Sequence, residues 1–92
     1  MEIASEHPDH GFQFPGTFEL SALGRAEASL ERVLPELLSA AGIQVRTDMI
    51  QSRPSSRGRY VSVRIGFRAE DRAQYDLAHQ MLRDHPEVKW TL

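Results

Sequence analysis

The sequence predicts an α+β domain in which one four-stranded sheet packs against two helices. Segments in which apolar and polar residues alternate indicate strands, and they lie at about 18–22, 43–49, 60–68 and 88–92. Two longer segments carry apolar residues at every third or fourth position, which indicates helices, and they span about 26–41 and 70–84. The order is therefore βαββαβ, and a chain of 92 residues is long enough for one domain with a single core.

The N-terminal segment differs from the rest because it shows no hydrophobic period. Proline, glycine and scattered charges stand there instead. We therefore expect residues 1–13 to form a flexible arm and residues 14–92 to form the domain. His7, Asp9 and His10 are residue types that ligate metals, but no fourth ligand accompanies them. We expect no metal site there, and no motif in the chain indicates a cofactor.

The composition indicates in which cellular compartment the protein lies and excludes several kinds of chemistry. The chain has no cysteine, which excludes a disulfide framework and thiol catalysis. No apolar run approaches the roughly 20 residues that a membrane-spanning helix needs. The N-terminus begins Met-Glu and lacks the positive charge and apolar stretch of a signal peptide. We therefore expect a cytoplasmic protein with no membrane partner.

The first strand is predicted from an alternation that ends just before a glycine. Phe18, Leu20 and Ala22 alternate with polar residues and so share the face that packs on the core. Leu23 and Gly24 follow directly. We expect these two residues to turn the chain into the first helix.

The first helix carries an apolar stripe that falls on one face: Ala26, Leu30, Val33, Leu34, Leu37, Leu38 and Ala41. Gly42 follows it, as is common just after a helix C-terminus. Pro35 lies inside the stripe, where a proline removes a backbone hydrogen bond and costs about 3 kcal/mol. Because the stripe keeps its phase across Pro35, the sequence predicts one kinked helix.

The second half of the chain repeats the pattern with a long turn-rich loop at 52–58. In the second strand the residues predicted to share one face are Ile43, Val45, Thr47 and Met49. In the third strand they are Val61, Val63, Ile65 and Phe67. The second helix is expected to begin at the acidic pair Glu70–Asp71 and to stop before His85–Pro86. In the last strand the residues predicted to share a face are Val88, Trp90 and Leu92.

Few packings are open to this order of elements, because crossover connections are right-handed. The commonest is the ferredoxin-like sandwich with sheet order 4-1-3-2. We expect antiparallel pairing except for a central parallel pair. Both helices should then cover one face of the sheet and leave the other face open.

The segment Arg53-Pro54-Ser55-Ser56-Arg57-Gly58-Arg59-Tyr60, followed by Val-Ser-Val, resembles the basic-Pro-Ser-Ser-basic-Gly-x-Tyr segment of the YbeD family. These are small bacterial proteins of unknown function. The agreement in element order extends over nearly the whole chain, from about Phe14 to Leu92. The resemblance implies a ferredoxin-like fold similar to that of ACT regulatory domains, and it brings no established activity or ligand.

Positive charge is concentrated in the hairpin formed by the second and third strands. Between Met49 and Ala69 the chain has no acid and five arginines, namely Arg53, Arg57, Arg59, Arg64 and Arg68. The remaining residues hold six basic side chains and thirteen acids, a balance of −7. Guanidinium forks and backbone N–H groups of a glycine-containing loop suit anions. The candidate anion or partner site is Arg53, Ser55, Ser56, Arg57, Gly58, Arg59 and Arg64.

Parity on the predicted strands extends this charge onto the open sheet face. Arg46, Arg64 and Arg68 all have outward parity. Glu19 on the first strand is expected to face Arg64, as a cross-strand pair and not as an acid–base pair.

Three functions could explain the cluster of arginines. The simplest is a solvated hairpin that keeps the protein soluble. Weak, non-specific nucleic-acid binding is the second, although RNA readout needs stacking aromatics, and on the third strand only Tyr60 is aromatic with outward parity. No catalytic motif is present, so we do not expect an enzyme. The sequence favours a non-catalytic regulatory or interaction module that binds a small anionic ligand or an acidic protein partner.

The second helix has more apolar surface than one buried face requires. Its core stripe is predicted to comprise Tyr75, Ala78 and Leu82, and a second stripe comprises Ala73, Leu77 and Met81. We expect Leu77 and Met81 to form a partner interface, either in a weak homodimer or with another protein.

Overall fold

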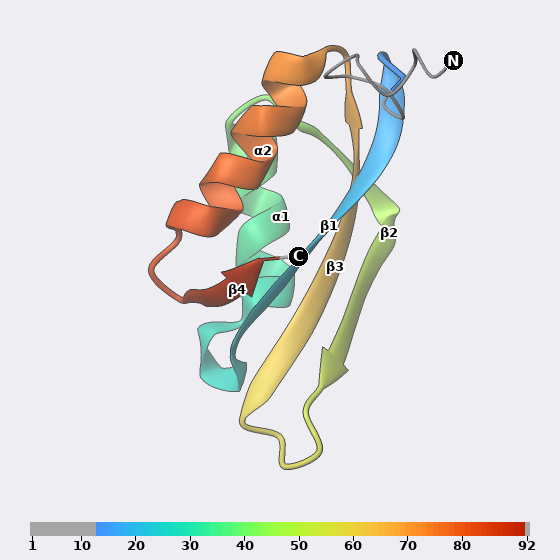
Figure 1. Ribbon diagram of the computed structural model, residues 1–92. Coiled ribbons are helices and arrows are strands. Elements are labelled where there is room, and N and C mark those ends of the chain that lie inside the picture. Colours follow the sequence, from blue (N-terminus) through green and yellow to red (C-terminus); the bar gives the residue numbers. More distant parts are fainter. Residues whose placement is uncertain (1–12, 92) are drawn as a thin grey trace, which may run out of the picture.

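The computed structural model describes residues 13–91, and its order of elements is the predicted one. They are β1 (Gly16–Arg25), the short 3₁₀ helix η2 (Ala26–Ala28), α1 (Leu30–Ala40), β2 (Gln44–Pro54), β3 (Tyr60–Ala69), α2 (Arg72–Asp84) and β4 (Val88–Thr91). The strands form one sheet in the order β2-β3-β1-β4, and both helices lie on the same side of it (Figure 1). The predicted ferredoxin-like fold and sheet order are confirmed. The predicted flexible arm falls almost entirely outside the described residues, as do His7, Asp9 and His10.

All three strand pairs are antiparallel, so the predicted central parallel pair is wrong. A helical crossover returns the chain in its original direction, so β2 runs parallel to β1. The tight hairpin then reverses the chain, and β3 therefore runs against β1. The two crossover-related strands, β1 and β2, are not neighbours because β3 lies between them.

Strand β1 is longer than predicted, because the chain does not turn at Leu23 and Gly24. Both residues remain paired with β3, opposite Ser62 and Val61. Gly24 is buried, and a Cβ there would lie 2.5 Å from the carbonyl oxygen of Glu87 and still nearer to the side chain of Leu30. This glycine serves close packing of three segments and not a turn.

Helix α1 begins later than predicted and ends where predicted. Ser29 lies in the left-handed region, at φ 53°, between η2 and α1. From there the helix continues through Pro35 as a single element. At its end the N–H of Gly42, at φ 90°, donates to Ser39 O, and the N–H of Ile43 donates to Leu38 O, both at 3.0 Å. These two bonds form a Schellman motif, which satisfies terminal carbonyls of the helix.

Strand β2 contains a bulge that overturns part of its predicted alternation. Arg46 lies opposite Gly66, whereas Ile50 lies opposite the adjacent Ile65, so three residues of β2 have no counterpart on β3. Val45 and Ile50 therefore both pack against the core. Met49 crosses to the open face, where its side chain lies over Gly66, close to where a Cβ would stand.

A second bulge in β4 overturns the predicted alternation of the last strand. Val88 pairs with Gly24 and Trp90 pairs with Leu23, which leaves Lys89 as an extra residue. Val88 packs against the core. Trp90 instead shares the open face with Leu23 and is 63% exposed.

The core lies between the sheet and the two helices. Its buried apolar side chains come from every layer: Leu20, Ala22, Leu30, Leu34, Leu38, Ile43, Val63, Ile65, Phe67, Ala69, Ala78 and Leu82. Phe18 and Tyr75 extend it, with ring centroids 5.2 Å apart. Helix α2 ends before His85 and Pro86 as predicted, and its N-cap is Asp71, whose carboxylate accepts from the N–H of Gln74 at 3.0 Å. Neither described α-helix has the length and apolarity to span a membrane.

We predict that Gly24→Ala destabilises the protein by about 1–3 kcal/mol, because the added methyl overpacks against Leu30 and the backbone at Glu87. Urea unfolding measures the difference. Ser21→Ala on the same strand is the matched control, since its side chain belongs to the open face and should change stability little. Equal stability of the two variants would show that the structure relaxes around the new methyl group.

Candidate functional site

The loop of the arginine-rich hairpin is an ordered turn. Ser55 and Tyr60 close it, with the Ser55 N–H donating to Tyr60 O at 2.8 Å and the Tyr60 N–H donating to the Ser55 hydroxyl at 3.2 Å. The N–H of Gly58, at φ 75°, donates to Ser55 O at 2.9 Å. Serine at the first position and glycine at the fourth are typical of a type I turn. The sequence therefore specifies this loop locally.

The same hydrogen bonds limit which backbone groups can bind an anion. The amides of Ser55 and Gly58 already donate within the loop. In the part of the chain that the structure describes, the amides of Ser56 and Arg57 donate to no protein acceptor. Two of the four amides proposed for anion recognition remain available for it.

The hairpin is also fixed at its base. The Ala26 N–H donates to Arg59 O at 2.8 Å, and Arg25 pairs with Tyr60 at the last register position of β1 and β3. The loop itself projects beyond both helices (Figure 1). Arg57 and Arg59 are therefore carried on an anchored backbone but remain exposed to solvent.

Nine of the ten arginines of the protein fall into two groups, and the tenth, Arg83, donates a hydrogen bond to Gln80 Oε1 at 2.8 Å. Five of them form ion pairs with nearby acids: Arg25, Arg32, Arg46, Arg68 and Arg72. Among residues 13–91, no ion pair involves Arg53, Arg57, Arg59 or Arg64. The unpaired group consists of the four arginines of the predicted site.

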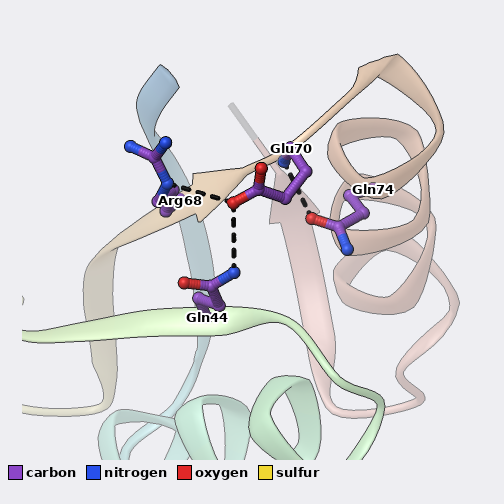
Figure 2. A network of polar contacts seen from close by, with 4 residues as sticks. All are labelled: Gln44, Arg68, Glu70 and Gln74. Atoms are coloured by element: carbon purple, nitrogen blue, oxygen red, sulfur yellow. Dashed lines mark hydrogen bonds and ion pairs between the residues drawn. The ribbon is translucent and has the colours of Figure 1, made fainter. Parts of the chain in front are cut away.

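Arg68 shows how the paired group is held (Figure 2). Its Nε donates to a Glu70 carboxylate oxygen at 3.1 Å, and the same oxygen accepts from Gln44 Nε2 at 3.3 Å. The Glu70 N–H in turn donates to Gln74 Oε1 at 2.9 Å. These contacts join the start of β2 and the end of β3 to the first turn of α2, so Arg68 belongs to a structural network. Arg46 is likewise paired, with Asp48 at 3.4 Å.

Two sequence predictions about the open face therefore change. Of the three arginines predicted to extend charge over it, only Arg64 is unpaired among the described residues. The predicted pairing of Glu19 with Arg64 is wrong, because Glu19 lies opposite Gly66, and Arg64 lies opposite Ser21 and Gln51. Arg64 therefore adds its charge to the unpaired group.

The open face contains two hollows. One, of about 510 Å³, is polar and is lined by Gln51, Ser52, Arg53, Ser62 and Arg64. The other, of about 250 Å³, is mostly apolar and is lined by Ser21, Ala22, Leu23, Ser62 and Trp90. Sequence reasoning missed Trp90, Leu23 and Ser62. The parity of Trp90 depends on the bulge at Lys89, and no local signal in the sequence marks that bulge.

The predicted partner stripe on α2 is divided in the structure. Met81 packs against the core, whereas Leu77 is 43% exposed. Met81 therefore contributes to the fold of the monomer. Leu77 is left as an exposed leucine, and single exposed leucines are common on protein surfaces. An interface through this stripe stays a prediction.

The family model and the similar sequences of known proteins indicate the same family. Residues 9–92 match the family model described as "Protein of unknown function (DUF493)". A UPF0250 protein of Xanthomonas campestris pv. campestris is 65% identical, and one of Stenotrophomonas maltophilia is 68% identical. Both alignments run over 92 residues and cover 100% of each chain.

Two solved structures share the fold. Protein HP0495 from H. pylori matches with a TM-score of 0.69 at 13% identity, covering 94% of each chain. The C-terminal domain of the MgtC protein from Mycobacterium tuberculosis matches with a TM-score of 0.60 at 15% identity, covering 83% of this chain and 82% of that domain. At such low identity the likeness concerns the fold alone. The family match and the full-length relatives confirm the resemblance carried by the segment from Arg53 to Tyr60: the chain belongs to the DUF493 (UPF0250) family, the YbeD-like small bacterial proteins of unknown function.

Proposed function

We propose that the protein is a non-catalytic regulatory or interaction module that binds an anionic small ligand or an acidic protein partner through its arginine-rich hairpin. One observation supports this most strongly. Within the described residues, Arg53, Arg57, Arg59 and Arg64 form no ion pair, while five other arginines are paired with acids. These four arginines gather at the hairpin loop and the adjoining parts of β2 and β3, whereas Arg46 and Arg68, nearer the other end of the same two strands, are paired with acids.

Electrostatics explains why an anion would be favoured there. Four guanidinium groups on two adjacent strands and their loop repel one another, and salt screens only part of that repulsion at such short range. A bound anion converts the repulsion into attraction. Arginine also offers several donors in a fixed plane, which suits the paired oxygens of carboxylate and phosphate.

The chemistry of the hairpin favours binding over catalysis. Arginine stays protonated in proteins and cannot exchange a proton with a substrate at neutral pH. The Ser55 hydroxyl accepts the Tyr60 N–H, so it helps to close the turn. The two described histidines lie elsewhere: His79 is on α2, and His85 follows α2 and accepts the N–H of Glu87 through Nδ1 at 3.1 Å.

Nucleic-acid binding is the second candidate, and the position of Trp90 supports it. Weak single-strand binding combines a basic track with aromatic side chains on which bases stack. The sequence offered only Tyr60 on the third strand, but the bulge in β4 adds Trp90 to the same sheet face. The platform remains sparse, so we rank this function below binding of a small anion or an acidic protein.

We predict that inorganic phosphate or citrate perturbs the amide resonances of Ser55–Gly58 before others in an NMR titration. Within that loop, Ser56 and Arg57 should shift most, because their N–H groups have no protein acceptor among the described residues. Replacing Arg53, Arg57 and Arg59 together with alanine should lower the affinity at least about tenfold, since charge-assisted bonds are lost.

The matched control removes the same charge elsewhere. Arg32 and Arg46 are ion-paired, and Arg83 is hydrogen-bonded to Gln80, so their combined replacement by alanine should leave the loop shifts almost unchanged. If anions perturb other regions and leave the loop silent, the assigned site is wrong. If both triple variants lost the same affinity for the anion, the binding would depend only on the net charge of the protein and not on the hairpin.

The same two triple variants distinguish nucleic-acid binding from the binding of a small anion or an acidic protein. A nucleic-acid binder should bind a fluorescent single-stranded oligonucleotide with a log–log salt slope of roughly −3, if four phosphates are contacted. For the proposed module we expect only weak binding that disappears at physiological salt. A steep slope that flattens in the hairpin triple variant, and not in the control, would favour nucleic acid instead.

A further inference from the structure

The two hollows of the open face adjoin because both are lined by Ser62. The register explains their arrangement: Trp90 lies opposite Leu23, Leu23 opposite Ser62, and Ser62 opposite Arg53. These four residues form one row across the sheet. With strands about 4.8 Å apart, the row spans about 14 Å. It runs from an exposed aromatic ring at one edge to an unpaired arginine at the other.

Arg64 lies in the next row, between Ser21 and Gln51. It lines the polar hollow together with Arg53. Neither arginine has an ion-pair partner within residues 13–91. The polar hollow therefore presents two positive charges beside the hydroxyl of Ser62.

We propose that the two hollows form one binding site for a small phosphate monoester of a planar ring, in the size class of a nucleoside monophosphate. The ring would stack on Trp90 above Leu23, and the phosphate would lie between Arg53 and Arg64 with Ser62 at the junction. The inference rests on the proposed function, because it assumes that the unpaired arginines bind an anion, and it names the ligand.

Each part of the ligand follows from an observation. The apolar hollow ends on an indole that is 63% exposed, and one face of an aromatic side chain favours a flat ring. Two unpaired arginines match the charge of about −2 on a phosphate monoester better than the single charge of a carboxylate. The polar hollow, of about 510 Å³, lies in the range of sites for small molecules, roughly 300–1,000 Å³. The apolar hollow, of about 250 Å³, is smaller than that range and matches only a part of a ligand.

The spacing of the row also suits such a ligand. Trp90 on β4 and Ser62 on β3 are separated only by β1, a distance of about 10 Å between their strands. Trp90 in this row and Arg64 in the next row both have long side chains that can lean towards Ser62. A ring joined to phosphate through a sugar-sized linker can therefore contact both Trp90 and Arg64.

Trp90 is the single tryptophan of the chain, so its fluorescence reports on the apolar hollow directly. The experiment titrates the full chain with adenosine monophosphate, adenosine and inorganic phosphate at constant ionic strength. We expect adenosine monophosphate to quench the fluorescence at concentrations about tenfold or more below those of adenosine, because the phosphate adds charge-assisted bonds. Inorganic phosphate alone should leave the fluorescence unchanged.

Two variants on the open face test the arginine role. Arg64→Gln should lower the affinity for adenosine monophosphate about tenfold, to the level of adenosine, without affecting adenosine itself. Arg46→Gln is the matched control, because Arg46 is exposed on the same face but pairs with Asp48. The variant Trp90→Leu has no tryptophan fluorescence, so its binding is followed by the NMR shift of the Ser62 amide. Saturating that shift should require at least about tenfold more adenosine monophosphate than in the unsubstituted protein.

The outcomes separate this inference from the proposed function. If adenosine monophosphate shifts the loop amides of Ser56 and Arg57 while Trp90 stays silent, the hairpin binds anions and the two-hollow site is wrong. If no anion shifts either region, both proposals fail. If a short oligoadenylate binds tighter than the monophosphate by more than its number of nucleotides, with steep salt dependence, single-stranded nucleic acid replaces the small ligand.

Discussion

The antiparallel pairing of β1 with β3 is the constraint on which the rest of the structure depends. It runs without a bulge from Gly16 opposite Ala69 to Arg25 opposite Tyr60. Because side chains alternate along both strands, this one register decides which side of the sheet becomes the core. Leu20 and Ile65, paired within it, are buried beneath the helices, and every polar residue between such pairs is directed to the open face.

The two outer strands adapt to this fixed centre. Each of them has a single partner, so an extra residue disturbs only one ladder, and bulges are most common at sheet edges. The bulge in β2 carries Met49 over Gly66, where the missing Cβ leaves room for it. The bulge in β4 carries Trp90 to the open face beside Leu23. Both irregularities thus place large apolar side chains on a face that strict alternation would have left polar.

The difference between the regular central strands and the bulged outer strands explains how much of the structure could be predicted from the sequence alone. The alternation in β3, the apolar stripe of α1 and the turn chemistry around Ser55 and Gly58 are local signals, and each predicted its element. The bulges, the role of Gly24 and the pairing of Arg68 with Glu70 depend on what lies opposite a residue, which a single sequence does not state. The arginine cluster was therefore visible as composition, whereas its division into paired and unpaired members required the register.

The unpaired arginines and the bulge in β4 together shape what the open face can recognise. Charge alone gives attraction at long range but little selectivity, because Arg57 and Arg59 extend from the loop into solvent. Selectivity requires a contact that depends on the shape of the ligand, and Trp90 with Leu23 supplies such a surface one row from Arg64. The hairpin would then draw anions towards the sheet, and the apolar hollow would retain those that carry a flat ring. If Lys89 were paired regularly with Leu23, Trp90 would lie opposite Ala22 and face the core, and the open face would offer charge without a means of discrimination.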